Sequence, residues 1–473
     1  MSTTEKRVFL ILSVLLWVYL WLRAWQVPII YDEVATFYHY IHKGEFLPWL
    51  SHWDANNHIL NSALGIISYK MFGSSPLALR LPNLLVSVLF FVYCFKMAGE
   101  ISNKYLRWLF ILSLLFSHSF VDYFTVSRGY GMSIALLFGG IWYLMQSVKL
   151  ASTKNYLLSL LFINLAVLAN LTLIFTLFIF IGLLLLNLIN RKNIWLPGII
   201  TFIAGILPAS FFVKLLFFMK AKGLLYYGSA AGFKSMTLWS LVKYFSGVES
   251  SALEYLVIVY FAIILLVLVF LISKTKWNNV FSNTHFIFGF LLIGNVVAII
   301  LNASLFDVNY PEDRAGLFLF PFFIGSLIFI ADETKFKQLQ QVLVGLSTVF
   351  LFFPIHFIFN ANLSHNSLEN FRILQRFYDK VEDEQIPNEP LATIGGSHNK
   401  ELMWSYLNFR NGGKLSQMST RSYPSLDLDY QITGYANDPD WFALYDSIDY
   451  DPQTQFYLVR RKQFLTRKTI QTE

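Results

Sequence analysis

Long apolar runs alternate with short polar connections over the first 360 residues of the chain. A helix needs about 20 mostly apolar residues to cross a bilayer, and fewer when it lies inside a bundle. By this measure the pattern predicts eleven transmembrane helices. They cover residues 8–29, 77–96, 105–123, 129–148, 155–169, 171–190, 194–217, 252–273, 284–304, 315–331 and 339–360. The apolar stretch 155–190 is divided near Asn170, because one helix of that length would reach roughly 50 Å.

Lysine and arginine residues fall in alternate connections between these helices. If the N-terminus is cytoplasmic, nearly all the inside connections are short, and every one is basic, which is the usual bias of cytoplasmic loops. The basic residues concerned are Lys6, Arg7, Lys96, Lys104, Arg107, Lys149, Lys154, Arg191, Lys192, Lys274, Lys276, Lys335 and Lys337. We therefore expect a multi-pass protein of the inner (plasma) membrane, with a cytoplasmic N-terminus and an extracytoplasmic C-terminus.

The composition changes near residue 361, where charged segments such as "RFYDKVEDEQIPNEP" replace the apolar runs. The segment "KELMWSYLNFR" indicates a helix, and "LDYQITGY" and "QFYLVRR" indicate strands. We therefore expect a transmembrane domain over residues 1–360 and a small soluble, extracytoplasmic α/β domain over 361–473. The fold class is thus an α-helical polytopic membrane protein with a soluble C-terminal domain.

Composition supports a lipid environment. Hydrophobic residues make up 56% of the 473 residues and charged residues only 14%, whereas soluble domains carry about 25% charged residues. The net charge of +7 is explained by membrane topology, so no nucleic-acid partner is expected. The single cysteine, Cys94, excludes an intrachain disulfide and a cysteine zinc site.

Unusual polar residues gather in the connections assigned to the outer side. The first outer loop, 30–76, begins with "YDEVATFYHY", which places Asp32 and Glu33 side by side just after the first helix. It continues as "NNHILNSALGIISYKMFG", an amphipathic stretch too short to span and expected to lie at the interface. Two further turns, "HSFVDYFTVSRGYG" and "DVNYPEDRAG", supply Asp122, Arg128 and Arg314. We predict that these turns converge on one site.

The residue types indicate the chemistry of that site. The planar guanidinium of arginine matches the oxygens of a phosphate, and a carboxylate can accept the proton of an attacking hydroxyl. Together they favour transfer of a sugar from a lipid-linked phosphate, with the arginines stabilising the leaving group. The sequence contains neither a Walker loop nor a dinucleotide fingerprint, which argues against a soluble nucleotide cofactor.

Four segments of residues 1–331 resemble the GT-C glycosyltransferases, the superfamily of protein O-mannosyltransferases and lipid A aminoarabinose transferases. The segments are "YDEVATFYHY", "NNHILNSALGIISYKMFGSSPLALRLPNLL", "VSRGYGMSIALLFGG" and "PEDRAGLFLFPFFIGSLIFI". The resemblance implies a GT-C-like fold and an inverting transferase that uses a polyprenyl-phosphate sugar.

The same resemblance assigns roles to individual residues. Asp32 is the expected catalytic base, and Glu33 supports it or orients the acceptor. The residues expected to bind substrate are Asn57, His58, Asp122, Arg128, Tyr130 and Arg314. No cofactor is assigned, and a divalent metal held by His58 with Asp32 is left open. The acceptor is a glycolipid, a polysaccharide or a protein.

Two other functions are weighed against the transferase. A transporter or flippase of a lipid-linked saccharide would place its polar residues near the bilayer midplane and often shows internal repeats. No repeat is seen, and the polar residues gather at one interface. A scaffold for polymer assembly would not need Asp32.

Overall fold

The computed structural model describes residues 1–54, 57–150, 152–189, 195–365, 372–385, 389–420, 427–434 and 443–462. The basic connection expected at Arg191 and Lys192 lies outside these residues. The chain divides into two compact units. The first comprises residues 1–21, 45–65 and 80–361, and the second comprises residues 22–44, 66–79 and 362–473.

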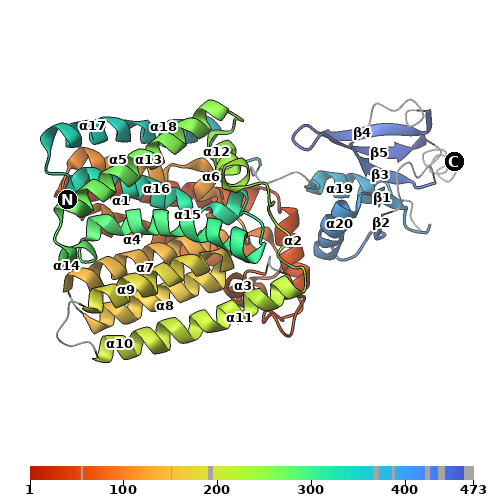
Figure 1. Cartoon of the computed structure of the whole chain (residues 1–473). Helices are drawn as coiled ribbons and strands as arrows, with labels where there is room; N and C mark the ends of the chain where they lie inside the picture. The colour runs from red at the N-terminus through yellow and green to blue at the C-terminus, as the bar shows by residue number, and fades with distance from the viewer. Residues whose placement is uncertain are drawn as a thin grey trace. The chain divides into compact units, whose positions relative to one another are not determined.

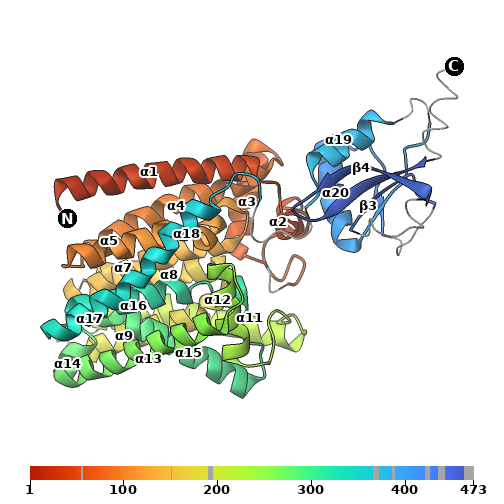
Figure 2. The same cartoon turned by 90° about the horizontal axis from the view of Figure 1, so that it is seen from above.

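Apolar helices dominate the first unit, where many of them run side by side (Figures 1 and 2). Within the described residues, nine helical segments are long and apolar enough to cross a membrane. They are α1 (Thr3–Gln26), α4 (Pro76–Ala98), α7 (Gly129–Leu150), η3–α9 (Leu171–Leu173, Ile174–Ile189), α10–η4–α11 (Trp195–Thr201, Phe202–Ile206, Leu207–Ala221), α13 (Ser251–Lys274), η6–α15 (Thr284–Phe286, Ile287–Phe306), η7–α16 (Asp313–Gly316, Leu319–Glu333) and α17–η8–α18 (Lys337–Ser347, Thr348–Leu351, Phe352–Asn360). The protein is therefore an integral, multi-pass membrane protein.

The two remaining predicted spans are also helical. One is a pair bent by 56°, formed by α5 (Lys104–Leu115) and the segment α6–η2 (His118–Val121, Asp122–Thr125). The other is α8 (Thr153–Ala169), which has 17 residues and ends at the break expected near Asn170. The first unit also contains the shorter helices η5 (Phe233–Leu238), α12 (Trp239–Ser246) and α14 (Trp277–Val280).

Burial separates inner helices from outer ones. In the most apolar window of α7, 83% of the residues are buried, and in that of η7–α16 the share is 89%. The corresponding share is only 17% in α17–η8–α18 and 28% in α13, whose apolar side chains face outward. Outward-facing apolar surface is stable in contact with lipid, so the second group forms the lipid-facing wall.

The amphipathic stretch of the first outer loop forms α3 (Ile59–Phe72). Two of its polar side chains, Asn61 and Ser68, are buried, while Ile67, Met71 and Phe72 are exposed. Ser68 donates a hydrogen bond of 2.5 Å to the carbonyl of Ala78 in α4. That carbonyl lies four residues before Pro82, which has no N–H to offer it. Ser68 of α3 therefore supplies the hydrogen bond to the carbonyl of Ala78 that Pro82 cannot make within α4.

The second unit combines the helix that follows α1 with a small sheet domain. Its elements are α2 (Tyr31–Thr36), the π-helical turn η1 (Phe37–Ile41), α19 (Gln375–Asp383), β1 (Ile394–Gly396), α20 (His398–Arg410), β2 (Met418–Ser419), β3 (Tyr430–Thr433), β4 (Tyr445–Asp451) and β5 (Phe456–Arg461). The strand order is β2-β1-β3-β5-β4, with β2, β1 and β3 parallel and the last two pairings antiparallel. The predicted helix and both predicted strands of this region are confirmed as α20, β3 and β5.

A buried arginine links the end of α1 to the segment that leads into the sheet domain. The guanidinium of Arg23 donates to the carbonyl oxygens of Asn362, at 2.5 Å, and His365, at 3.1 Å. Its side chain is fully buried. Several charge-assisted bonds to backbone oxygens offset the cost of burying this charge.

Candidate active site

The turn that carries Arg128 is held by two buried asparagines. Asn83 of α4 donates to the carbonyl of Val126 at 2.9 Å and accepts from the backbone N–H of Met132 at 3.1 Å. It also donates to Asn61 of α3, which itself donates to the carbonyl of Ser127 at 3.2 Å. Two helices thus fix the backbone on both sides of Arg128, whose side chain is only 2% exposed.

The side chain of His58 caps the C-terminal end of α8 by a hydrogen bond to its last carbonyl. The last carbonyls of a helix have no partner within it, and the Nδ1 of His58 lies 2.7 Å from the carbonyl oxygen of Ala169. Gly129, the first residue of α7, makes this approach feasible. A Cβ atom on Gly129 would lie 1.8 Å from the same carbonyl oxygen and 2.7 Å from the Cβ of His58. Close packing therefore requires a glycine at position 129, the first of the two glycines in "SRGYG".

The hydrogen bond sets the tautomer of His58. A carbonyl oxygen can only accept, so Nδ1 carries the proton and Nε2 is an acceptor. Nε2 is buried and has no hydrogen-bond partner within the described residues. Burial, reinforced by the charges of Arg128 and Arg314, holds the pKa of His58 well below its usual value. His58 is consequently a neutral acceptor beside two guanidinium groups.

Arg314 enters from the turn η7, whose backbone is under strain. The preceding residue, Asp313, has a φ of 44°, an unfavourable value for a residue with a side chain. The N–H of Asp313 donates to the Oγ of Ser240 at 2.9 Å, and Thr237 donates to the carbonyl of Pro311 at 2.6 Å. Contacts with η5 and α12 therefore hold Arg314 in place.

Tyrosine rings contact His58 and Arg314. The ring of Tyr130 lies 4.6 Å from that of His58 and 5.1 Å from that of Tyr123. The guanidinium of Arg314 stacks over Tyr227 at 5.2 Å from the ring centroid. Burial raises the pKa of Tyr227, and the charge of Arg314 opposes this rise.

His58, Arg128, Tyr130 and Arg314 are called the arginine cluster below. Its two guanidiniums come from turns that are 186 positions apart in the chain, and both act electrostatically on one imidazole. The cluster combines two fixed positive groups, a neutral acceptor and a phenol ring. Such a set favours an anionic, oxygen-rich ligand, because guanidiniums bind phosphate or carboxylate oxygens in pairs.

Two other predicted residues of the first unit make contacts of a different kind. Asp122 is fully buried, and its Oδ2 lies 3.7 Å from the Nδ1 of His118. Asn57 donates to the carbonyl of Phe46 at 3.0 Å and accepts from the hydroxyl of Ser62 at 3.1 Å. These contacts stabilise the bent segment α6–η2 and the start of α3, respectively.

The carboxylate pair lies in the second unit, in the first turn of α2. Glu33 is fully buried and accepts from the backbone N–H of Ile30 at 3.0 Å, which caps the helix. Asp32 is half-buried at the same helix start, where the positive end of the helix dipole stabilises negative charge. The two carboxylates thus differ in accessibility. Glu33 is buried and bonded in the helix cap, whereas part of Asp32 is accessible to solvent.

No set of three His, Cys, Asp or Glu side chains within the described residues is arranged to hold a metal ion. The role of Asn83 was not predicted from the sequence, although it follows Pro82 in the "LRLPNLL" motif. Tyr227 was also missed, because the long connection after α11 shows no periodic pattern.

The comparisons with known proteins add a structural likeness. No protein-family model matches the chain, and no curated protein matches it significantly. The chain is similar to crystal structures of ArnT from Cupriavidus metallidurans, one bound to undecaprenyl phosphate and one in the apo state. The TM-scores are 0.41 and 0.42, with 12% identity over 97% of this chain and 98% of each of those chains. Since this likeness is low, the function is argued from the site.

Proposed function

We propose that the protein is a membrane glycosyltransferase that moves a sugar from a polyprenyl-phosphate donor to an extracytoplasmic acceptor. The acceptor is a glycolipid, a polysaccharide or a protein, and the anomeric configuration is inverted. The arginine cluster is the observation that carries the proposal.

The cluster supports a phosphate-bearing donor for two reasons. Its guanidiniums supply positive charge, and the low pKa of His58 keeps the imidazole neutral, so that Nε2 can accept a hydrogen bond from a sugar hydroxyl. The exposed apolar side chains of α3 fit a lipid-facing position close in sequence to His58, as a donor with a long hydrocarbon tail requires. We assign phosphate binding to Arg128 and Arg314, and substrate contacts to His58 and Tyr130.

We assign the role of general base to Asp32. A base must meet the substrate, and Asp32 is only partly buried whereas Glu33 is fully buried in the helix cap. Glu33 then acts as a positioning residue, because its cap fixes the first turn of α2. Asn57 and Asp122 support the site through the loop and helix contacts described above.

The proposed step is a displacement at the anomeric carbon. The acceptor oxygen forms a bond to that carbon from the face opposite the phosphate, while its proton passes to Asp32. The bond between the anomeric carbon and the phosphate oxygen breaks, and its electron pair leaves on the lipid phosphate. Arg128 and Arg314 stabilise this charge, as fixed cationic groups do in other transfer reactions.

The first test compares envelope glycans by mass spectrometry in cells that carry the protein, lack it or carry a variant. We expect one sugar to be missing without the protein and with Asp32→Asn, since loss of a general base costs about 10²- to 10⁴-fold in rate. Glu249→Gln, which changes an exposed carboxylate, is the control. A normal glycan profile with a folded Asp32→Asn variant would favour a flippase or a scaffold.

The second test measures binding of undecaprenyl phosphate to the purified protein. Arg128→Lys keeps the charge but loses paired recognition, so we expect about 10- to 100-fold weaker binding. Arg376→Lys, which alters an exposed arginine of the sheet domain, should bind normally. Equal binding by both variants would remove Arg128 from the phosphate site.

A further inference from the structure

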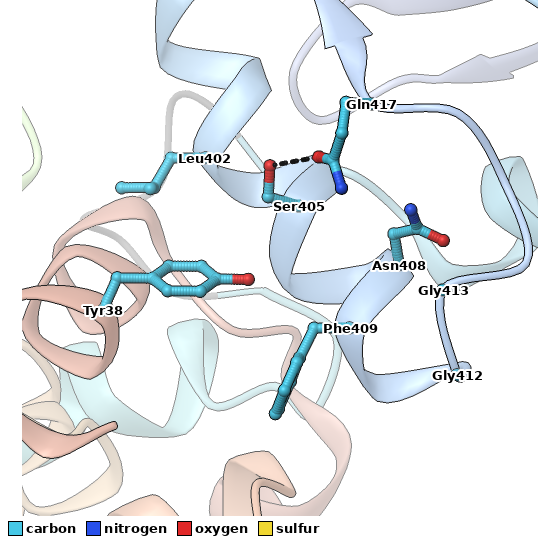
Figure 3. A pocket seen from close by; sticks show the side chains of 8 residues that line it. All are labelled: Tyr38, Leu402, Ser405, Asn408, Phe409, Gly412, Gly413 and Gln417. Atoms are coloured by element: carbon cyan, nitrogen blue, oxygen red, sulfur yellow. Dashed lines mark hydrogen bonds between the residues drawn. The ribbon is translucent and has the colours of Figure 1, made fainter. Parts of the chain in front are cut away.

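A pocket lies within the second unit, between η1 and α20 (Figure 3). Its volume is about 680 Å³. The lining residues come from η1, from α20 and from the turn that leads to β2. They are Tyr38, Leu402, Ser405, Asn408, Phe409, Gly412, Gly413 and Gln417. None of these side chains carries a charge.

The walls of the pocket are fixed by contacts behind them. The ring of Phe37 packs against Tyr406 at 5.5 Å and Phe409 at 5.8 Å. His42 packs against Phe409 at 5.1 Å, and the hydroxyl of Tyr406 donates to the carbonyl of Ser74 at 2.6 Å. Aromatic packing thus holds η1 on α20, which makes the pocket a built feature of the fold.

A glycine turn shapes the opposite wall. Gly412 and Gly413 have φ values of 84° and 72°, which residues with side chains rarely adopt. The buried amide of Asn408 secures this turn, since it donates to the carbonyl of Leu415 at 2.7 Å and accepts from the backbone N–H of Leu415 at 3.1 Å. The backbone of Gly412 and Gly413 lines this wall, and the absence of side chains there leaves the edge of the pocket open.

The polar groups of the pocket suit hydroxyl groups. Ser405 donates to the Oε1 of Gln417 at 3.0 Å, so Gln417 offers the two N–H groups of Nε2, and Ser405 offers oxygen lone pairs. The phenol of Tyr38 points across the pocket toward α20 (Figure 3). Burial raises the pKa of Tyr38 to about 12, so its hydroxyl is neutral and can both donate and accept.

An apolar ring completes the set. Phe409 is 40% exposed and lines the pocket, so part of its ring surface is open to a ligand. A sugar ring presents C–H groups on one face and hydroxyls around its edge. The pocket offers an aromatic surface, an amide, a phenol and a serine oxygen, but no charge for a phosphate or carboxylate.

The pocket is also linked to the proposed base by one continuous helical segment. Tyr38 follows Asp32 by six positions along α2 and η1, which corresponds to about 9 Å of helix rise. The segment becomes π-helical at Phe37–Ile41, and such irregular turns occur often at functional sites. A saccharide held at Tyr38 would therefore lie about 9 Å along the helix axis from Asp32, so that a chain of more than one sugar unit is needed to span the two.

We propose that this pocket binds an uncharged sugar ring of the acceptor glycan, behind the unit whose hydroxyl is glycosylated. This inference rests on the proposed transferase function and names the acceptor as a saccharide of more than one unit.

The test uses full-length protein in detergent and the neutral oligosaccharide fraction released from the envelope of cells that lack the protein. Binding of the fluorescently labelled fraction is measured for the wild type, Tyr38→Phe and Gln417→Leu. Each variant keeps the size of the side chain and removes hydrogen-bonding groups, so we expect about tenfold weaker binding. Tyr450→Ala, which removes an exposed ring on β4, is the control and should bind like the wild type.

A transfer assay separates this inference from the proposed function. We expect Gln417→Leu to raise the KM for the acceptor about tenfold and to leave the KM for the donor unchanged. One outcome would be that Asp32→Asn abolishes transfer while the pocket variants bind and react like the wild type. The pocket inference would then be wrong, and the proposed transferase function would be supported. If the wild type transfers no sugar, the transferase fails. A wild type that binds no neutral oligosaccharide, or that binds an envelope peptide fraction instead, also overturns the pocket inference.

Discussion

Replacing Gly129 by alanine should damage both stability and activity. The new Cβ would lie 1.8 Å from the carbonyl oxygen of Ala169, whereas ordinary contacts begin near 3.4 Å. The start of α7 and the end of α8 must then separate by about 1.5 Å. Overpacking of this kind costs about 1–3 kcal/mol. Because His58 is bonded to the same carbonyl, it shifts as well, and a displacement of about 1 Å at a site can lower the rate about 100-fold.

Thermal unfolding in detergent, binding of undecaprenyl phosphate and sugar transfer would be measured on the same Gly129→Ala preparation. Gly182→Ala is a matched control, because a Cβ there meets no atom within 4 Å and alanine favours a helix by about 1 kcal/mol. We expect the control to be as stable as the wild type or more stable, with full activity. A Gly129→Ala variant with an unchanged unfolding temperature and unchanged transfer would refute the close approach of α7, α8 and His58.

Three further predictions concern stability. The unfolded chain binds a proton at His58 below about pH 6.5 while the folded protein does not, so this residue should reduce stability by up to about 1.4 kcal/mol for each pH unit below that value. His58→Gln should flatten the fall in unfolding temperature between pH 6.5 and 5, and parallel curves would contradict the low pKa. Asn83→Ala removes three buried hydrogen bonds and should cost about 2–4 kcal/mol in thermal unfolding; a smaller loss than 1 kcal/mol would show that the network is dispensable. Asp307, at the end of α15, has a φ of 49°, so Asp307→Gly should raise stability by about 1 kcal/mol, and a lower unfolding temperature would argue against this backbone conformation.

The helical part of the fold could be predicted from the sequence because lipid imposes a simple rule. Each crossing needs a long apolar run, and within the described residues each of the eleven predicted segments contains helix. The break at Asn170 was visible as a polar residue within an overlong run. The inward orientation of Asn61 and Ser68 could not be predicted in this way. An amphipathic pattern gives two faces, and only tertiary contacts such as the bond from Ser68 to Ala78 decide which face is buried.

The site was predictable in part. The sequence indicated Arg128 and Arg314 through their positions at helix starts, and the charges of both contribute to the low pKa of His58. It did not indicate that Glu33 caps α2, although Glu at the third position of a helix is a known capping signal. It also gave no sign of Asn83, because a buried amide network joins α3, α4 and α7 across positions that are distant in the chain.

The contact of Arg23 with Asn362 and His365 ties the end of α1 to the segment that follows α18. Asn362 comes two residues after the end of α18, so the last turn of α1 and the exit from α18 lie at the same level. The close approach of Gly129 to Ala169 brings the start of α7 to the end of α8, and their other ends are joined by a short connection. Helix α8 therefore runs antiparallel to α7 and packs along it.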